Sequence, residues 1–158
     1  MRATIILLLT IIYISVFGQG LTGEYNDYHG HSLDLKQDST FRYEWKFDLA
    51  MNWAVGRWKI SDDFIILDFR NVYDTLHRLD KTDSLVLSGD ERSTRISSDQ
   101  FVLTLISSST QRHDGITNRL CMKKHRLYLV DSNGGLITER REGIWDKKKR
   151  PTWYSKSE

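Results

Sequence analysis

Residues 41–48, FRYEWKFD, and residues 56–69, GRWKISDDFIILDF, decide the fold class of this chain. In the first stretch every second residue is aromatic and every residue between is charged. Because successive side chains of a strand point to opposite faces, this alternation predicts a half-buried β-strand. A helix would scatter the same rings around its axis.

The second stretch has the pattern of a β-hairpin. Trp58 and Ile60 alternate with basic residues, residues 61–63 supply a polar turn, and residues 64–69 return as an apolar strand. Gly56 marks a position of close backbone approach or a bulge. The segment therefore carries the architecture of a small β-protein.

Other stretches extend the strand pattern, and Asn133-Gly134 is the strongest hairpin signal because both residues tolerate the positive φ of a type I′ turn. Residues 70–82 fit helical and strand spacing alike, and their neighbours favour a strand. About 8–10 short strands predict an all-β, single antiparallel up-and-down barrel, with a β-sandwich as the alternative. The further strand segments are 33–36, 84–88, 100–107, 115–123, 126–131 and 136–145.

The first 19 residues have the layout of a secretory signal peptide. Arg2 precedes an apolar run from Ile5 to Val16, and small residues follow at Gly18 and Gly20. The run is shorter than the roughly 20 residues that span a bilayer, which disfavours a membrane anchor. We therefore expect an exported protein, periplasmic or extracellular after cleavage, with no transmembrane segment in the mature chain.

The charge balance and the cysteine count limit the classes of function. A net charge of +2 over 158 residues argues against nucleic acid as a partner. Cys121 is the only cysteine, which excludes an intrachain disulfide, and its apolar neighbours predict a strand residue. The basic and aromatic residues 148–158 are expected to form a C-terminal tail whose aromatic side chains fold back on the barrel, with contact to a membrane surface or a polyanion as the alternative.

No motif for catalysis, a metal or a cofactor is found in the sequence. His29 and His31 are two residues apart, but two ligands do not complete a zinc site. No GxSxG, GxxxxGK[ST] or GxGxxG pattern occurs. We therefore predict a protein that is not an enzyme and has no catalytic residues, no metal and no cofactor.

The aromatic residues are the remaining functional signal, since aromatic side chains fill small barrels and also line pockets for apolar ligands. An eight-stranded barrel is either packed solid or holds one small ligand. If this barrel is hollow, the residues predicted to contact the ligand are those at alternate positions of the two stretches quoted first. They are Tyr43, Trp45, Phe47, Trp58 and Ile60.

Three short motifs carry a resemblance to a family. Gly23-Glu24-Tyr25, the LxLxxDxxF pattern of residues 33–41, and Gly56-Arg57-Trp58 together resemble the small exported bacterial proteins of lipocalin-like type. The resemblance covers about residues 21–70 and implies an exported β-barrel.

The prediction for the whole chain has three parts: a signal peptide (1–19), a lipocalin-like barrel domain (20–147) and the C-terminal tail (148–158). The expected function is binding of a small apolar or amphipathic ligand inside the barrel. The alternative is a filled barrel that serves as an interaction or structural domain of the cell envelope, with a protein as its partner.

Overall fold

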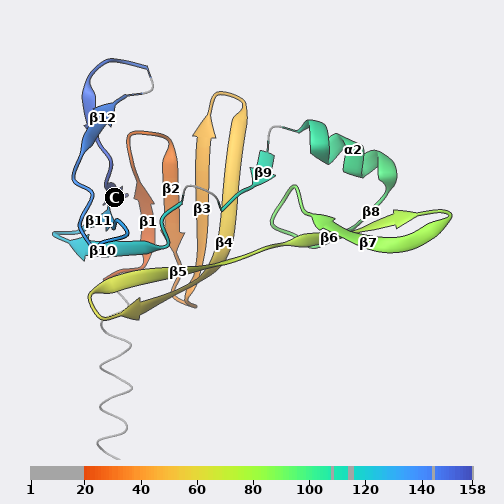
Figure 1. Ribbon diagram of the computed structural model, residues 1–158, viewed down its shortest axis with the longest axis horizontal. Helices are drawn as coiled ribbons and strands as arrows, with labels where there is room; N and C mark the ends of the chain where they lie inside the picture. Colours follow the sequence, from red (N-terminus) through yellow and green to blue (C-terminus); the bar gives the residue numbers. More distant parts are fainter. Residues whose placement is uncertain (1–19, 108, 114–115, 144, 158) are drawn as a thin grey trace, which may run out of the picture.

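The computed structural model describes residues 20–107, 109–113, 116–143 and 145–157, and a closed β-barrel is its main feature (Figure 1). Eight antiparallel strands follow one another around the barrel in chain order, and the last pairs with the first. This confirms the predicted all-β, up-and-down antiparallel barrel. The eight strands are β1 (Gly23–Asn26), β2 (His31–Leu35), β3 (Thr40–Phe47), β4 (Ala50–Ser61), β5 (Phe64–Arg70), β10 (Arg119–Lys123), β11 (Arg126–Leu129) and β14 (Tyr154–Lys156).

The alternation of side chains along the strands builds the core, as the sequence predicts. Phe41 and Tyr43 of β3 point inward and are buried, whereas Arg42 between them lies on the outer face. Trp58 of β4 is buried at the end of the barrel that carries the short turns between strands. Its Nε1 donates a hydrogen bond to the Lys36 carbonyl at 3.0 Å. The buried core cluster comprises Tyr25, Leu33, Leu35, Phe41, Tyr43, Ala54, Trp58, Ile65, Leu67, Leu120, Leu127 and Tyr154.

Gly56 lies where the long strand β4 exchanges neighbours. The first part of β4 pairs with β3 and the second part with β5, and Gly56 pairs with Phe41 on one side and Phe69 on the other. A Cβ atom at Gly56 would lie 2.0 Å from the Asp68 carbonyl oxygen and 2.8 Å from the Phe41 ring. The close backbone approach predicted at this glycine is therefore present.

A large insertion, residues 71–118, separates the neighbouring strands β5 and β10. Figure 1 shows it extending to one side of the barrel as a small sheet with a helix. Trp53 of β4 joins the two parts, since it is 1 % exposed and its Nε1 donates to the Gly89 carbonyl at 3.2 Å. The elements of the insertion are β6 (Tyr73–Arg78), β7 (Lys81–Leu87), β8 (Arg95–Ile96), α2 (Ser98–Ile106) and β9 (Ser109–Gln111).

Within the insertion, two of the predicted strands are confirmed and one is wrong. The strand favoured within 70–82 is present as β6, and β7 covers most of 84–88. The strand predicted over 100–107 is wrong, because Ser98–Ile106 is a helix. Ser97 caps that helix: its side chain accepts from the Gln100 backbone N–H while the Gln100 side chain accepts from the Ser97 N–H.

The segment after β11 also differs from the prediction. Of Asn133 and Gly134 only Gly134 has a positive φ, so the turn is not type I′, and a single bridge between Val130 and Leu136 replaces the predicted returning strand. Asp131 organises the loop instead, because its side chain accepts from the backbone N–H groups of Asn133 and Gly135. A short hairpin follows, formed by β12 (Arg140–Glu142) and β13 (Lys149–Pro151).

The C-terminal segment contributes the closing strand of the barrel. β14 pairs with β1 and with β11, and Tyr154 is buried in the core. The barrel thus extends to Lys156, past the boundary at 147 that composition indicated. A strand of three residues is too short to show the alternation that identifies a strand in sequence.

The two ends of the barrel differ in their connections. One end is closed by the short links of residues 36–39, 62–63 and 124–125, and the other carries residues 27–30, 48–49, the insertion and the β12–β13 hairpin. No helix among the described residues is long and apolar enough to span a bilayer. The expected signal peptide, residues 1–19, lies outside the described residues.

Candidate functional site

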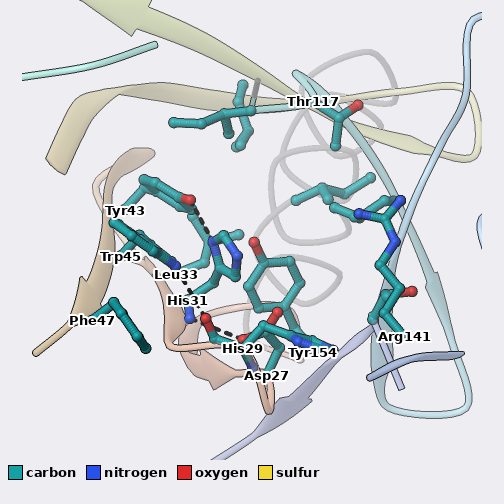
Figure 2. A pocket seen from close by; sticks show the side chains of 15 residues that line it. Asp27, His29, His31, Leu33, Tyr43, Trp45, Phe47, Thr117, Arg141 and Tyr154 are labelled. Carbon is teal, nitrogen blue, oxygen red and sulfur yellow. Dashed lines mark hydrogen bonds between the residues drawn. The ribbon is translucent and has the colours of Figure 1, made fainter. Parts of the chain in front are cut away.

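A cavity of about 440 Å³ lies within the barrel at the end that carries the long connections (Figure 2). One side of it is aromatic, and the opposite side is aliphatic. A group of polar side chains comes from the β1–β2 loop and the segments flanking β12 and β13. The aliphatic side is lined by Leu67, Ile116, Leu120 and Leu129, and Leu33 lies beside Tyr43 on the aromatic side.

The aromatic side comes from β3, whose inward positions carry Tyr43, Trp45 and Phe47. Trp45 and Phe47 stack with ring centroids 6.2 Å apart, and Phe47 stacks in turn on Trp145 at 5.3 Å. Trp145 is 82 % exposed, so the row of stacked rings runs from the cavity to solvent. Trp45 is fixed further by its Nε1, which donates to the His29 carbonyl at 3.1 Å.

The polar end is organised by Asp27 in the β1–β2 loop. Its Oδ1 accepts hydrogen bonds from the backbone N–H groups of His29, at 2.8 Å, and His31, at 2.9 Å. The loop is held in this shape at Gly30 as well, since its φ is +82° and a Cβ there would lie 2.3 Å from the Lys46 carbonyl oxygen. The loop therefore presents both histidine side chains to the cavity, as Figure 2 shows.

Burial shifts the pKa values of the groups at this end. His31 Nδ1 and the Tyr43 hydroxyl share a hydrogen bond of 2.5 Å. Desolvation lowers the pKa of His31 and raises the pKa of Tyr43, in both cases favouring the neutral form. The pKa of Tyr154 is also raised, first by burial and then by the nearby Tyr43 and Asp27.

Two polar side chains at this end are turned towards the cavity. Nε2 of His29 is buried and makes no hydrogen bond to the described part of the chain, and the hydroxyl of Tyr154 faces the cavity. A buried polar group without a hydrogen bond costs free energy that a polar ligand atom recovers on binding. Arg141 adds a cationic side chain to the lining, and its guanidinium lies 3.9 Å from the Glu139 carboxylate.

The residues predicted to bind a ligand divide into two groups. Tyr43, Trp45 and Phe47 line the cavity together. Trp58 and Ile60 do not, because their part of β4 runs to the opposite end of the barrel, where Trp58 is buried in the core and Ile60 is 48 % exposed. Alternation identifies the inward face of a strand, but it does not say at which end the interior is hollow.

Several residues that line the cavity are not predicted from the sequence. Asp27, His29 and His31 lie in and beside a loop, where no periodicity marks an inward side chain, although the pair of histidines is a signal. Arg141, Thr152 and Tyr154 come from the segments assigned to a returning strand and a tail. Among the residues that the structure describes, no three His, Cys, Asp or Glu side chains are arranged to hold a metal ion.

The fold and the site define a class of protein: a closed, eight-stranded up-and-down β-barrel with a lined interior cavity at one end. Comparison of the chain with protein-family models, with curated proteins and with solved structures finds no match. The physical arrangement of the cavity therefore carries the functional argument.

Proposed function

We propose that this protein is an exported, lipocalin-like barrel that binds one small amphipathic ligand in its interior. The cavity of about 440 Å³ carries the proposal, because ligand sites are typically clefts of about 300–1,000 Å³ lined by apolar and aromatic groups with a few polar ones. The aromatic and aliphatic sides would hold an apolar body. The unpaired Nε2 of His29 and the Tyr154 hydroxyl that faces the cavity would hold a polar end group.

The test measures binding to the purified mature protein. Native mass spectrometry with organic extraction identifies any co-purifying molecule, and a panel of fatty acids and aromatic carboxylates is titrated against tryptophan fluorescence. A saturable signal is expected, since Trp45 lines the cavity. Absence of both a bound mass and a saturable response would contradict the proposal.

A cavity-filling variant makes the test specific. Leu129→Trp places an indole in the aliphatic side and is expected to weaken ligand binding at least about tenfold by removing space, while the barrel stays folded because Leu129 is only partly buried. The matched control is Leu85→Trp on the exposed face of β7, which should bind as the unmodified protein does. Equal affinities of the two variants would move the binding site away from the cavity.

A second candidate function, an interaction domain of the cell envelope, is favoured by the surface of the insertion. Of the twelve large hydrophobic side chains exposed among the described residues, eight lie on it. A concentration of exposed apolar side chains on one part of a protein favours an interaction site there. These eight are Tyr73, Leu79, Leu85, Leu87, Val102, Leu103, Leu105 and Ile106.

Site-specific photocrosslinking tests this second candidate. A photoreactive residue at Leu85 is expected to give a discrete adduct in cell-envelope preparations, and the same residue at Lys59, on the barrel wall, is not. The same adduct pattern at both positions would argue against an interaction surface on the insertion.

A further inference from the structure

The outer wall of the barrel carries three arginines on three neighbouring strands. In the β3–β4–β5 register, Val55 lies directly between Arg42 and Arg70. Arg57, two residues further along β4, lies on the same face between Thr40 and Asp68. Because side chains directly opposite one another share a face of the sheet, the three guanidinium groups project to the outside around Val55.

These arginines line a groove of about 460 Å³ that is separate from the interior cavity. Lys36 of the β2–β3 turn adds a fourth cation, and the groove also contains Asp68 and Glu91.

The cations of the groove are paired unequally. Arg42 is ion-paired with Glu44, at 2.5 Å, and with Glu91, and these carboxylates raise its pKa. In contrast, Arg57, Arg70 and Lys36 form no ion pair with any residue that the structure describes. Asp68 is opposite Arg57 in the register, yet their charged atoms are not within ion-pair distance. The groove therefore has an excess of positive charge with free donors.

The chemistry of the free donors selects an anion of a particular kind. A guanidinium presents a planar fork of N–H groups that matches two oxygens of a phosphate or sulfate group, and an ammonium adds a point charge. Asp68 and Glu91 flank these donors, so a long polyanion would meet carboxylates where a compact anion would not. We propose that this groove binds the phosphate or sulfate group of a monoester, held by Arg57, Arg70 and Lys36.

The test uses inorganic phosphate and inorganic sulfate as probes of the whole mature protein at low ionic strength. Isothermal titration calorimetry is expected to show one saturable site. The double variant Arg57→Gln/Arg70→Gln should lose at least about tenfold in affinity, because the charge-assisted hydrogen bonds of both guanidinium groups to the anion are removed and only Lys36 remains. Lys123→Gln/Arg140→Gln removes the same charge from exposed positions elsewhere and should keep the affinity within about twofold.

The outcomes separate the groove from general electrostatic attraction and from the interior site. Equal losses in the two double variants, or no saturable binding of either anion, would overturn the proposal. Cosedimentation with phosphatidylcholine vesicles that contain phosphatidic acid distinguishes a lipid headgroup from a free monoester as the source of the phosphate. Fluorescence titration of the interior cavity is expected to be unchanged in Arg57→Gln/Arg70→Gln, so failure of either proposal leaves the other testable.

Discussion

Gly56 shows how much a single missing side chain contributes to this barrel. The rings of Phe41 and Phe69, which flank it in the register, meet edge to face with centroids 5.3 Å apart. The Asp68 carbonyl oxygen occupies the place that a Cβ would need. The strand can therefore coil tightly at the point where β4 exchanges one neighbour for the other.

Gly56→Ala is expected to lower the free energy of unfolding by about 2–3 kcal/mol, because the added methyl group must displace backbone rather than a flexible side chain. Urea denaturation followed by circular dichroism measures the change. Gly20→Ala is the control, since a Cβ there meets no atom within 4 Å. Equal stabilities of the two variants would show that the close approach at Gly56 is not needed.

His31 should make the stability of the protein depend on pH. Burial lowers the pKa of His31, so below about pH 6.5 the unfolded chain takes up a proton that the folded chain does not. The folded state is then stabilised fully above about pH 6.5 and loses stability as the pH falls towards the lowered pKa. The carboxyl groups of Asp38, Glu44 and Asp83 have lowered pKa values, so their contribution is lost only in more acidic solution.

Urea denaturation at about pH 7.5 and about pH 5.5 isolates this contribution from the carboxyl groups. We expect the stability difference between the two pH values to shrink in His31→Gln, which keeps a polar group beside Tyr43 but does not titrate. His125→Asn, in an exposed turn, should keep most of the difference. An unchanged difference in His31→Gln would assign the pH dependence to another group.

Among the elements, the β10–β11 hairpin has the least favourable turn sequence for its shape. Lys123 pairs with Arg126, so Lys124 and His125 form a two-residue loop, with φ values of 51° and 61°. Positive φ at both positions is the type I′ geometry, which strongly prefers Asn-Gly. The loop is therefore strained in its present sequence.

Replacing the loop by Lys124→Asn/His125→Gly is expected to raise the free energy of unfolding by about 1 kcal/mol, since the left-handed conformation then costs less. Thermal denaturation measures this as a higher Tm. The same pair placed at the exposed Lys147 and Lys148, where neither residue has positive φ, should give no gain. A lower Tm for the first variant would contradict the turn geometry.

Helix α2 and strand β3 show why sequence predicts some elements and not others. The period of two in residues 41–48 spans a whole strand and outweighs any alternative. Residues 98–106 bury none of their side chains, and their apolar residues form two consecutive runs, 101–103 and 105–106, in place of the narrow stripe that identifies an amphipathic helix. The usable signal was the capping box from Ser97 to Gln100, four residues long.

At the scale of the whole molecule, sequence predicts the wall of the barrel better than its cavity. The inward side chains of β3 follow from alternation, and three of them line the cavity. The polar end depends on the β1–β2 loop and on residues 141–154, which reach the same place only after the barrel closes. Closure depends on pairing between residues more than a hundred positions apart, such as Tyr25 and Lys156.

The insertion should be removable without loss of the barrel. The chain leaves β5 and enters β10 at adjacent positions, since the Leu67 N–H donates to the Asn118 carbonyl at 2.8 Å. Continuing the β5–β10 register places Phe69 opposite Ile116. Replacing residues 70–115 by Asn-Gly is expected to give a cooperatively folded barrel that still binds the interior ligand.

This deletion variant is expected to be less stable than the full chain, because Trp53 loses its cover and its hydrogen bond to Gly89. Tryptophan fluorescence should shift to longer wavelength, and circular dichroism should show a single unfolding transition. Restoring the surface with Trp53→Thr is expected to recover part of the stability. A variant without cooperative unfolding would show that the barrel depends on the insertion.

The closed end of the barrel brings the two ends of the described chain together. The Ser157 N–H donates to the Glu24 carbonyl at 2.8 Å, and Nζ of Lys156 donates to the Gly20 carbonyl at 3.3 Å. A tag, a fluorophore or a surface linker fused at either place would therefore be held at the pole opposite the cavity. A molecule immobilised in this way would turn the cavity end of the barrel towards the solution, which is the orientation that a biosensor requires.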